Sequence, residues 1–320
     1  MKAAAIVFDR PRELSVRQLD LRPPQAGDIE VAVDFSGIST GTERMLWDGS
    51  MPPFPGLGYP LVPGYETVGT VLRTHGACGT GSGAIQAGDR VFVPGSYSFE
   101  AVHNLFGGAG ERLLVPHDRV VRIEGDGGAD SILLALAATA YHTVSQGGTT
   151  DPDLPPDLII GHGVMGRLLA RLTVAAGAPA PVVWETQPQR QSGARDYVVM
   201  HPDDDERKDY RAVYDVSGDA DILQRVIPRL ARGGEVVLAG FYSRDLSFAY
   251  APAFMREARI RVAAEWRRAD LLAVNELLNT GRLELDGLVT HTERPGRAGE
   301  AYETAFRDAD CLKMVMDWRH

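Results

Sequence analysis

Residues 157–166, DLIIGHGVMG, run from a short apolar segment directly into a Gly-x-Gly-x-x-Gly motif. Apolar residues then recur at helical spacing, so the sequence predicts a strand, a tight glycine turn and a helix, in that order. In this context Gly161 permits the turn, Gly163 lets a pyrophosphate approach the backbone, and Gly166 lets the helix pack close to the strand. The N–H groups at the start of the helix attract phosphate. The residues expected to bind a dinucleotide here are Gly161, His162, Gly163, Val164, Met165 and Gly166.

The next apolar segment, residues 182–184, ends in an acidic residue, Glu185. A carboxylate at the end of the second strand accepts hydrogen bonds from a ribose 2′-hydroxyl and repels a 2′-phosphate. The alternative is that Glu185 is a surface acid at a strand end and that Arg190 holds a 2′-phosphate instead. We predict NAD as the cofactor, with Glu185 as the ribose ligand.

The overall composition excludes several classes of function. The 320 residues carry a formal net charge of −10 and have no basic stripe, which argues against nucleic acid as a partner. No run of about 18 apolar residues occurs, so we expect no membrane span. The two cysteines, Cys78 and Cys311, lie far apart in the sequence, and the N-terminus lacks the apolar core of a signal peptide. These features predict a cytoplasmic location.

The hydrophobic pattern divides the chain into two domains. Up to residue 130, short apolar runs alternate with Gly and Pro, which predicts a β-rich, barrel-like domain. A helix is expected at residues 131–146, followed by a proline-rich loop at 152–156. From Leu158 onwards strands and helices alternate, which predicts an α/β fold with a doubly wound parallel sheet and helices on both faces. The predicted domains are residues 1–143 completed by 284–320, and residues 144–283.

The individual elements follow from the same pattern. In the first domain we expect strands at residues 3–8, 29–36, 67–72, 90–93 and 112–115, with returning strands at 288–291 and 313–316. In the second domain we expect strands at residues 158–160, 182–184, 197–200, 212–216, 235–239 and 260–264, and helices at 220–231 and 269–279.

The chain resembles the medium-chain dehydrogenase/reductase superfamily over its whole length. The shared features are a β-rich first domain, a helix, a dinucleotide-binding domain and a short C-terminal segment that returns to the first domain. The motifs that carry the resemblance lie at residues 64–66, 88–91, 215–218 and 233–240. The resemblance implies a GroES-like β-barrel joined to a Rossmann domain. It also implies that the cofactor contacts Thr139, Ser217, Gly240 and Phe241. His142 lies near the expected nicotinamide position, and it is either a contact or a hydrogen-bonded core histidine.

The chain departs from the zinc-dependent members of that superfamily at the metal site. Those members hold zinc with Cys, His and Cys, and the resemblance places Ser39, Tyr65 and Ala135 at these positions. A structural zinc lobe needs four clustered cysteines, and this chain has two in total. Because zinc requires about four nitrogen, sulfur or oxygen ligands, we predict that the protein holds no metal.

Longer motifs resemble one zinc-free branch of the superfamily. They span residues 35–43, 51–66 and 310–314, together with the glycine turn. The resemblance implies an enzyme of bacteriochlorophyll synthesis that oxidises the 3-(1-hydroxyethyl) group of a bacteriochlorin to 3-acetyl with NAD. The implied partners are this tetrapyrrole substrate and a second copy of the chain, as a homodimer.

Oxidising an alcohol without zinc requires a hydride acceptor and a route for the hydroxyl proton. The resemblance places Ser39, Thr40, Thr42, Glu43, Tyr65 and Glu66 around the vacated metal site. Tyr65 or Ser39 is expected to hydrogen-bond the substrate oxygen, and Glu66 or Glu43 to receive the proton, directly or through water. The alternative for each is a structural role, with Ser39 and Thr42 as turn residues, Tyr65 filling the ligand space and Glu66 bracing the backbone.

Aromatic residues in two loops are candidates for the walls of a flat apolar pocket. The alternative for the first loop, residues 47–60, is an ordinary proline-rich surface loop. The candidate substrate-pocket residues are Trp47, Phe54, Tyr59, Phe99 and Phe106.

Two other functions share the predicted fold. One is a zinc-free quinone or enone reductase that uses NADPH, against which Glu185 argues. The other is an NAD-binding protein without enzymatic activity.

Overall fold

The computed structural model describes residues 1–53, 55–80, 83–125, 127–145 and 154–319. The chain forms two compact units, which are Met1–Ala135 with Leu285–His320 and Leu136–Glu284. Part of the predicted proline-rich loop at 152–156 falls outside the described residues.

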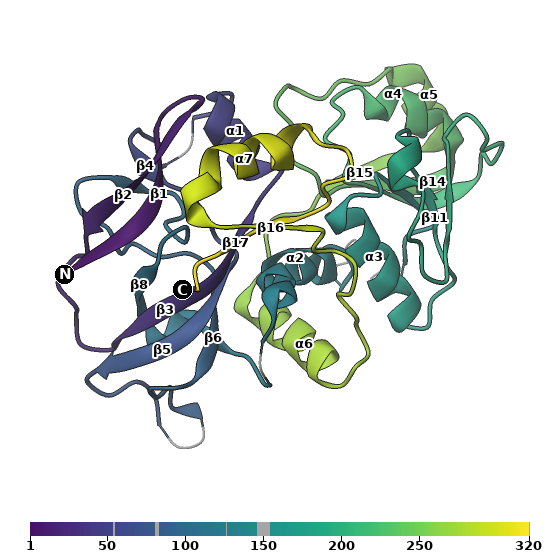
Figure 1. The fold of residues 1–320 in the computed structure, drawn as a ribbon. Helices are drawn as coiled ribbons and strands as arrows, with labels where there is room; N and C mark the ends of the chain where they lie inside the picture. Colours follow the sequence, from purple (N-terminus) through teal and green to yellow (C-terminus); the bar gives the residue numbers. More distant parts are fainter. Residues whose placement is uncertain (54, 81–82, 126, 146–153, 320) are drawn as a thin grey trace. The chain divides into compact units, whose positions relative to one another are not determined.

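The first unit contains two β-sheets (Figure 1). The smaller sheet has the order β2-β1-β4-β7 and consists of β1 (Lys2–Arg10), β2 (Glu13–Asp20), β4 (Leu61–Val62) and β7 (His103–Asn104). The larger sheet has the order β16-β17-β3-β5-β6-β9, with β8 also paired to β3. Its strands are β3 (Asp28–Ile38), β5 (Thr67–His75), β6 (Arg90–Val93), β8 (Arg112–Pro116), β9 (Val121–Arg122), β16 (His291–Glu293) and β17 (Met314–Asp317).

The C-terminal return completes the larger sheet. Figure 1 shows β17, in yellow, beside the purple β3, and the two strands pair antiparallel with Val315 opposite Gly37. This register brings the residue just before β17 next to the end of β3, where the predicted site begins. The helical elements of this unit are α1 (Thr42–Asp48), α7 (Ala298–Arg307), η2 (His117–Arg119), η3 (Ala129–Leu133) and η6 (Pro295–Arg297).

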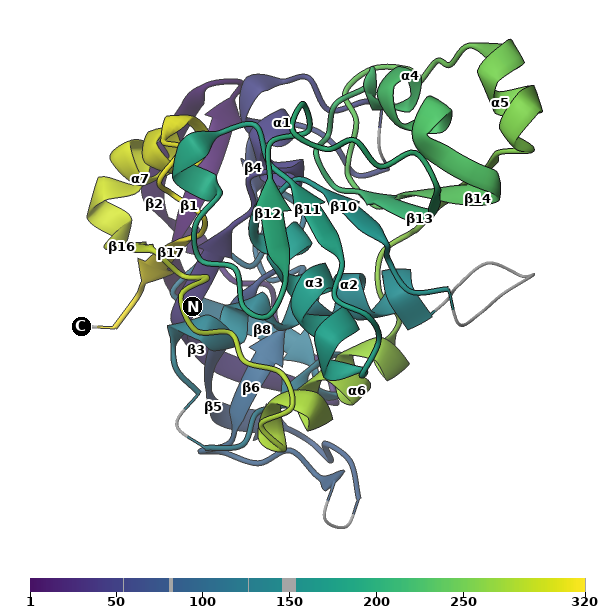
Figure 2. The same ribbon diagram turned by 90° about the vertical axis from the view of Figure 1, so that its right-hand side faces the viewer.

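The second unit contains a six-stranded, fully parallel sheet with the order β12-β11-β10-β13-β14-β15 (Figure 2). Its strands are β10 (Leu158–Ile160), β11 (Val182–Trp184), β12 (Val198–Met200), β13 (Tyr210–Asp215), β14 (Leu230–Leu238) and β15 (Arg259–Val262). Numbered from β10, this is the order 3-2-1-4-5-6 of a doubly wound dinucleotide-binding sheet. The structure therefore confirms the predicted α/β fold.

Helices cover this sheet because its strands are apolar on both faces. Residues of α4 and the turn after it share a hydrophobic cluster with Leu158, Ile160 and Val236. The buried leucines of α3 lie outside that cluster, and α3 contacts β10. The helical elements here are α2 (Leu134–Ser145), which begins at the end of the first unit, α3 (Val164–Ala175), α4 (Ile222–Val226), α5 (Tyr250–Arg256), α6 (Arg268–Asn279), η4 (Pro188–Arg190) and η5 (Ile227–Arg229). No helix among the described residues combines the length and apolarity needed to cross a membrane.

Three predicted elements are wrong in their bounds, one of them the strand expected at 235–239, which begins at Leu230. The helix expected at 220–231 ends at Val226, because Pro228 cannot donate a helical N–H bond, and β14 begins at Leu230. The strand expected at 288–291 lies instead at His291–Glu293, where it pairs with β17.

Candidate active site and cofactor site

The predicted cofactor residues gather at one edge of the parallel sheet. Parallel strands end at the same edge, and the strand order reverses between β10 and β13, where such sheets bind ligands. Gly161 follows β10, Glu185 follows β11 and Ser217 lies just beyond β13. Gly240 and Phe241 follow β14.

The glycine turn has the geometry that a dinucleotide requires. Gly161 has a φ of +99°, which L side chains rarely adopt. A Cβ atom on Gly166 would lie 1.8 Å from the carbonyl oxygen of Gly161, so only glycine lets α3 pack this close to the turn. A Cβ atom on Gly163 would meet no atom within 4 Å. The open space at Gly163, beside the first N–H groups of α3, fits a pyrophosphate.

This contrast gives a prediction for the two glycines. We expect Gly163→Ala to fold normally, because the added methyl group meets no protein atom. The methyl would occupy the space for the phosphates, so NADH affinity should fall by about tenfold or more, equivalent to about 1.4 kcal/mol. Fluorescence titration with NADH and thermal unfolding measure the two effects separately. Gly166→Ala should lower the unfolding temperature as well, and unchanged NADH affinity in Gly163→Ala would contradict this assignment.

Glu185 is held in place by two backbone donors. Its Oε2 accepts a hydrogen bond from the His162 N–H at 3.0 Å, and its Oε1 accepts one from the Gln187 N–H at 2.8 Å. A carboxylate can accept about four hydrogen bonds, so both oxygens can still accept from a ribose hydroxyl. Its side chain is largely buried, and it lies directly after the end of β11.

The remaining cofactor candidates occupy varied surroundings. The Ser217 hydroxyl donates to Asp215 Oδ1 at 2.7 Å, and Phe241 is 48% exposed. Val164 is buried, whereas Met165 and Thr139 are partly buried. Their contact with a cofactor stays a prediction. His142 is buried, and its Nδ1 lies 2.8 Å from Asp270 Oδ2, as expected of a hydrogen-bonded core histidine.

In the first unit, Ser39 and Tyr65 form a hydroxyl pair. Ser39 follows β3 and Tyr65 precedes the adjacent β5, so sheet pairing brings Ser39 Oγ within 2.7 Å of the Tyr65 hydroxyl. Thr42, the first residue of α1, also hydrogen-bonds this hydroxyl. Burial, together with the charges of Glu66 and Glu43, raises the pKa of Tyr65 far above its ordinary value. The phenol therefore remains protonated and can donate a hydrogen bond.

Glu43 is a buried carboxyl group whose charge acts on Tyr65. Its Oε2 accepts a hydrogen bond from the Tyr302 hydroxyl at 3.1 Å, whereas Oε1 has no hydrogen-bond partner among the described residues. Burial, and secondly the nearby charge of Glu66, raises the pKa of Glu43 to about 8. At neutral pH Glu43 is therefore mostly protonated.

Glu66 forms a buried ion pair with Lys313, which the sequence analysis did not assign to the site. The Lys313 ammonium contacts Glu66 Oε2, and both side chains are almost completely inaccessible to water. Burial raises the pKa of Glu66, and the Lys313 charge opposes that shift. Gly37 leaves room for the pair, because a Cβ there would lie 2.3 Å from Glu66 Oε2.

The zinc positions of the superfamily hold a different set of groups here. Ser39 and Tyr65 contribute hydroxyl groups and Ala135 contributes a methyl group, which do not make a tetrahedral zinc site. Among the residues that the structure describes, no three His, Cys, Asp or Glu side chains are grouped to hold a metal ion. The donor set therefore does not fit zinc.

The four described candidate pocket aromatics lie in or against the hydrophobic core of the first unit. Phe106 lies edge-on to Tyr65, with ring centroids 5.5 Å apart, whereas Phe99 is buried in the core. Trp47 packs against Phe8 with a centroid distance of 5.4 Å. The Tyr59 hydroxyl donates to the Leu46 carbonyl oxygen. Phe54 lies outside the described residues, and the substrate contact of all five stays a prediction.

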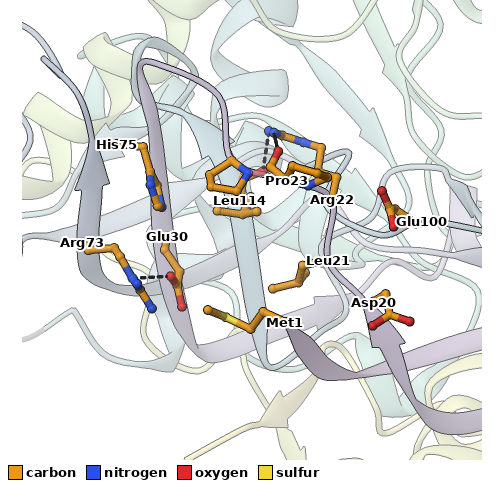
Figure 3. A pocket seen from close by; sticks show the side chains of 11 residues that line it. Met1, Asp20, Leu21, Arg22, Pro23, Glu30, Arg73, His75, Glu100 and Leu114 are labelled. Atoms are coloured by element: carbon orange, nitrogen blue, oxygen red, sulfur yellow. Dashed lines mark hydrogen bonds and ion pairs between the residues drawn. The ribbon is translucent and has the colours of Figure 1, made fainter.

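A separate cavity of about 320 Å³ lies in the first unit and shares no residue with these candidates (Figure 3). Charged groups line much of it, and Glu30 and Arg73 are paired across 2.6 Å. Nothing in its lining resembles a site for alcohol oxidation.

The chain combines a barrel-like β unit that holds a hydroxyl and carboxyl cluster with a parallel sheet that carries a glycine turn. This combination defines an alcohol-dehydrogenase-type oxidoreductase of the medium-chain dehydrogenase/reductase superfamily. Residues 25–125 match the alcohol dehydrogenase GroES-like domain. The chain is 50% identical over 324 residues to the 2-desacetyl-2-hydroxyethyl bacteriochlorophyllide A dehydrogenase of Cereibacter sphaeroides, covering 100% of this chain and 99% of the relative. The chain belongs to this family of dehydrogenases.

Solved structures share the whole fold at low sequence identity. A short chain alcohol dehydrogenase of Escherichia coli CFT073, complexed with NADH, aligns with a TM-score of 0.80 and 19% identity, covering 99% of both chains. A dehydrogenase of Sinorhizobium meliloti 1021 bound to NADP aligns with a TM-score of 0.79 and 20% identity, also over 99% of both chains. These likenesses show that each unit has a fold found in dehydrogenases of known structure.

Proposed function

We propose that this chain oxidises the 3-(1-hydroxyethyl) group of a bacteriochlorophyllide to a 3-acetyl group, with NAD as the hydride acceptor, in bacteriochlorophyll synthesis. The observation that carries the proposal is 50% identity over the full chain to a dehydrogenase named for this substrate. The glycine turn and the hydroxyl cluster supply the two binding functions that the reaction needs.

The choice of NAD over NADP rests on Glu185. A carboxylate at the end of β11 attracts the 2′-hydroxyl of the adenosine ribose and repels a 2′-phosphate. Both backbone contacts of Glu185 fix its side chain at that position. The solved relatives bind NADH in one case and NADP in the other, so the cofactor assignment depends on this residue.

The protein must bind the substrate oxygen and accept the hydroxyl proton, while bound NAD supplies the two-electron acceptor. Tyr65 shares one hydrogen bond with Ser39 and one with Thr42, so one of the three hydroxyl protons remains available for the substrate oxygen. The raised pKa of Tyr65 makes the phenol a donor that does not ionise at neutral pH. We propose that the hydroxyl groups of Tyr65 and Ser39 hydrogen-bond the substrate oxygen. The acetyl group formed is conjugated with the macrocycle, which favours the ketone without a metal.

The proton passes from the alcohol to Glu66. Glu43 is mostly protonated at neutral pH because of its pKa of about 8, so it is a poor acceptor. Lys313 stabilises the charged form of Glu66 and opposes the burial that raises the pKa of this carboxylate, so we assign Glu66 as the general base. Glu66 accepts the proton directly or through water. Thr42 hydrogen-bonds the Tyr65 hydroxyl and so links it to the start of α1.

The proposal is tested with purified protein, the hydroxyethyl bacteriochlorophyllide and either NAD or NADP. We expect a red shift of the long-wavelength absorption band and one NADH formed per acetyl product, with a much slower reaction with NADP. Tight NAD binding with no spectral change would instead indicate a protein that binds NAD without catalysis. Reduction of quinones or enones with NADPH, with no oxidation of the bacteriochlorin, would indicate a reductase.

We further propose a cytoplasmic homodimer. The edge strand β15 presents the exposed side chains of Ile260 and Val262, and Phe254 and Met255 of α5 are also exposed. An uncovered edge strand with apolar side chains favours pairing with another chain. Light scattering at micromolar concentration should give twice the chain mass of 34.7 kDa, and a monomer mass would contradict the proposal.

A further inference from the structure

His162 occupies the second position of the glycine motif, but its side chain points away from solvent and is completely buried. It lies between the glycine turn and the segment 185–193, which follows β11. We infer that His162 is a positioning residue that fixes this segment against the turn and thereby sets the preference for NAD over NADP. The inference rests on the proposed use of NAD.

The hydrogen bonds of the imidazole fix its tautomer. Nδ1 lies 2.6 Å from the carbonyl oxygen of Arg190, which can only accept, so Nδ1 carries the proton. Nε2 lies 2.8 Å from the Tyr197 hydroxyl, which therefore donates to it. Burial lowers the pKa of His162 to about 4, so the ring stays neutral at physiological pH. His162 thus holds the Arg190 backbone with a single, directed hydrogen bond.

Arg167, from the first turn of α3, holds the same segment at further points. Its guanidinium donates to the carbonyl oxygens of Arg190 at 3.2 Å, Ser192 at 2.8 Å and Gly193 at 3.1 Å. Its Nε also donates to the His162 carbonyl oxygen at 3.0 Å. A Cβ on Gly193 would lie 2.5 Å from this guanidinium, so the segment approaches it closely. His162 and Arg167 together form a clamp on the backbone of residues 190–193.

The clamp bears on cofactor choice because the segment carries two groups with opposite preferences. Glu185, at its start, favours a ribose hydroxyl, and Arg190 has the positive charge that attracts a 2′-phosphate. The His162 N–H binds the Glu185 carboxylate and the His162 ring binds the Arg190 backbone. His162 therefore contacts both Glu185 and Arg190, the two residues with opposite preferences at the adenosine ribose. The position of Arg190 relative to Glu185 depends on this clamp.

The test compares the affinities of NADH and NADPH for the full-length protein by fluorescence titration. We expect His162→Ala to reduce the ratio of the two affinities by about tenfold, with NADH binding weakened and NADPH binding retained or improved. Tyr197→Phe is the matched control, because it removes the other hydrogen bond of the ring and leaves the Arg190 contact in place.

Each outcome separates the inference from the proposed function. A wild-type protein that fails to bind NADH overturns the proposed function itself. An unchanged affinity ratio in His162→Ala, with a lower unfolding temperature, overturns the positioning role and leaves the proposed function intact. If His162→Ala does not fold, Arg167→Lys provides the second test, because it keeps the charge and loses the fork that holds three carbonyls. The ratio of NADH affinity to NADPH affinity should fall in Arg167→Lys, and an unchanged ratio would contradict the positioning role.

Discussion

Replacement of Tyr65 by phenylalanine should lower kcat by about 10²- to 10⁴-fold while leaving NAD affinity nearly unchanged, because the hydroxyl is assigned to the substrate oxygen. The substitution keeps the ring, and with it the edge-on contact to Phe106. It removes the hydrogen bond to Ser39 Oγ and the donor that the high pKa keeps protonated. Single-turnover hydride transfer with saturating NAD, measured across pH, gives the rate of the chemical step.

Ser39→Ala is the control for Tyr65→Phe. It removes the partner of the phenol but leaves the phenolic donor itself, so it should lower the rate less. If Tyr65→Phe retains nearly the wild-type rate, the cluster is structural, and the proton leaves through water or the cofactor ribose instead.

Replacement of Lys313 by methionine should destabilise the protein by about 3–5 kcal/mol, because it leaves the Glu66 carboxylate buried without its partner charge. The apolar stem of methionine fills a similar volume, so lost packing contributes little. Glu66 would also face the second buried carboxyl, Glu43, with no cation beside it. Urea unfolding followed by circular dichroism measures the change in the free energy of unfolding.

The double variant Lys313→Met with Glu66→Gln separates stability from catalysis. It removes both charges, so most of the lost stability should return. Its kcat should remain low, because glutamine cannot accept the alcohol proton. A Lys313→Met single variant as stable as the wild type would show that the ion pair is not needed, and a double variant with normal kcat would exclude Glu66 as the proton acceptor.

The sequence predicted the strands and the glycine turn of the second unit closely, because their signals are local. The glycine motif, the short apolar strands and Glu185 lie within 30 residues, and each strand begins within two residues of its expected start except β14. The helix of residues 222–226 is shorter than expected because Pro228 outweighs the apolar periodicity. The short helices α1 and α5 carry too few turns for periodicity to reveal them.

The buried partners in the first unit could not be predicted in the same way. The sequence shows Lys313 beside the apolar residues of the last predicted strand, and a lysine in that position indicates a buried acidic partner. The sequence does not show which acidic residue is that partner. That pairing depends on the register of β17 against β3, which places Val315 opposite Gly37. Tyr302 reaches Glu43 from α7, across a sequence separation of 259 residues. Long-range contacts of this kind arise only from the tertiary fold.

In the proposed reaction, hydroxyl and carboxyl groups perform an alcohol oxidation that the superfamily usually assigns to zinc. The most direct test is hydride transfer from the hydroxyethyl bacteriochlorophyllide to NAD by protein that has been exhaustively treated with chelator, with its metal content measured by elemental analysis on the same sample. The donor set of Ser39, Tyr65 and Ala135 predicts substoichiometric zinc and an undiminished rate. Stoichiometric zinc in the untreated protein, with activity lost on chelation and restored by added zinc, would contradict a zinc-free oxidation.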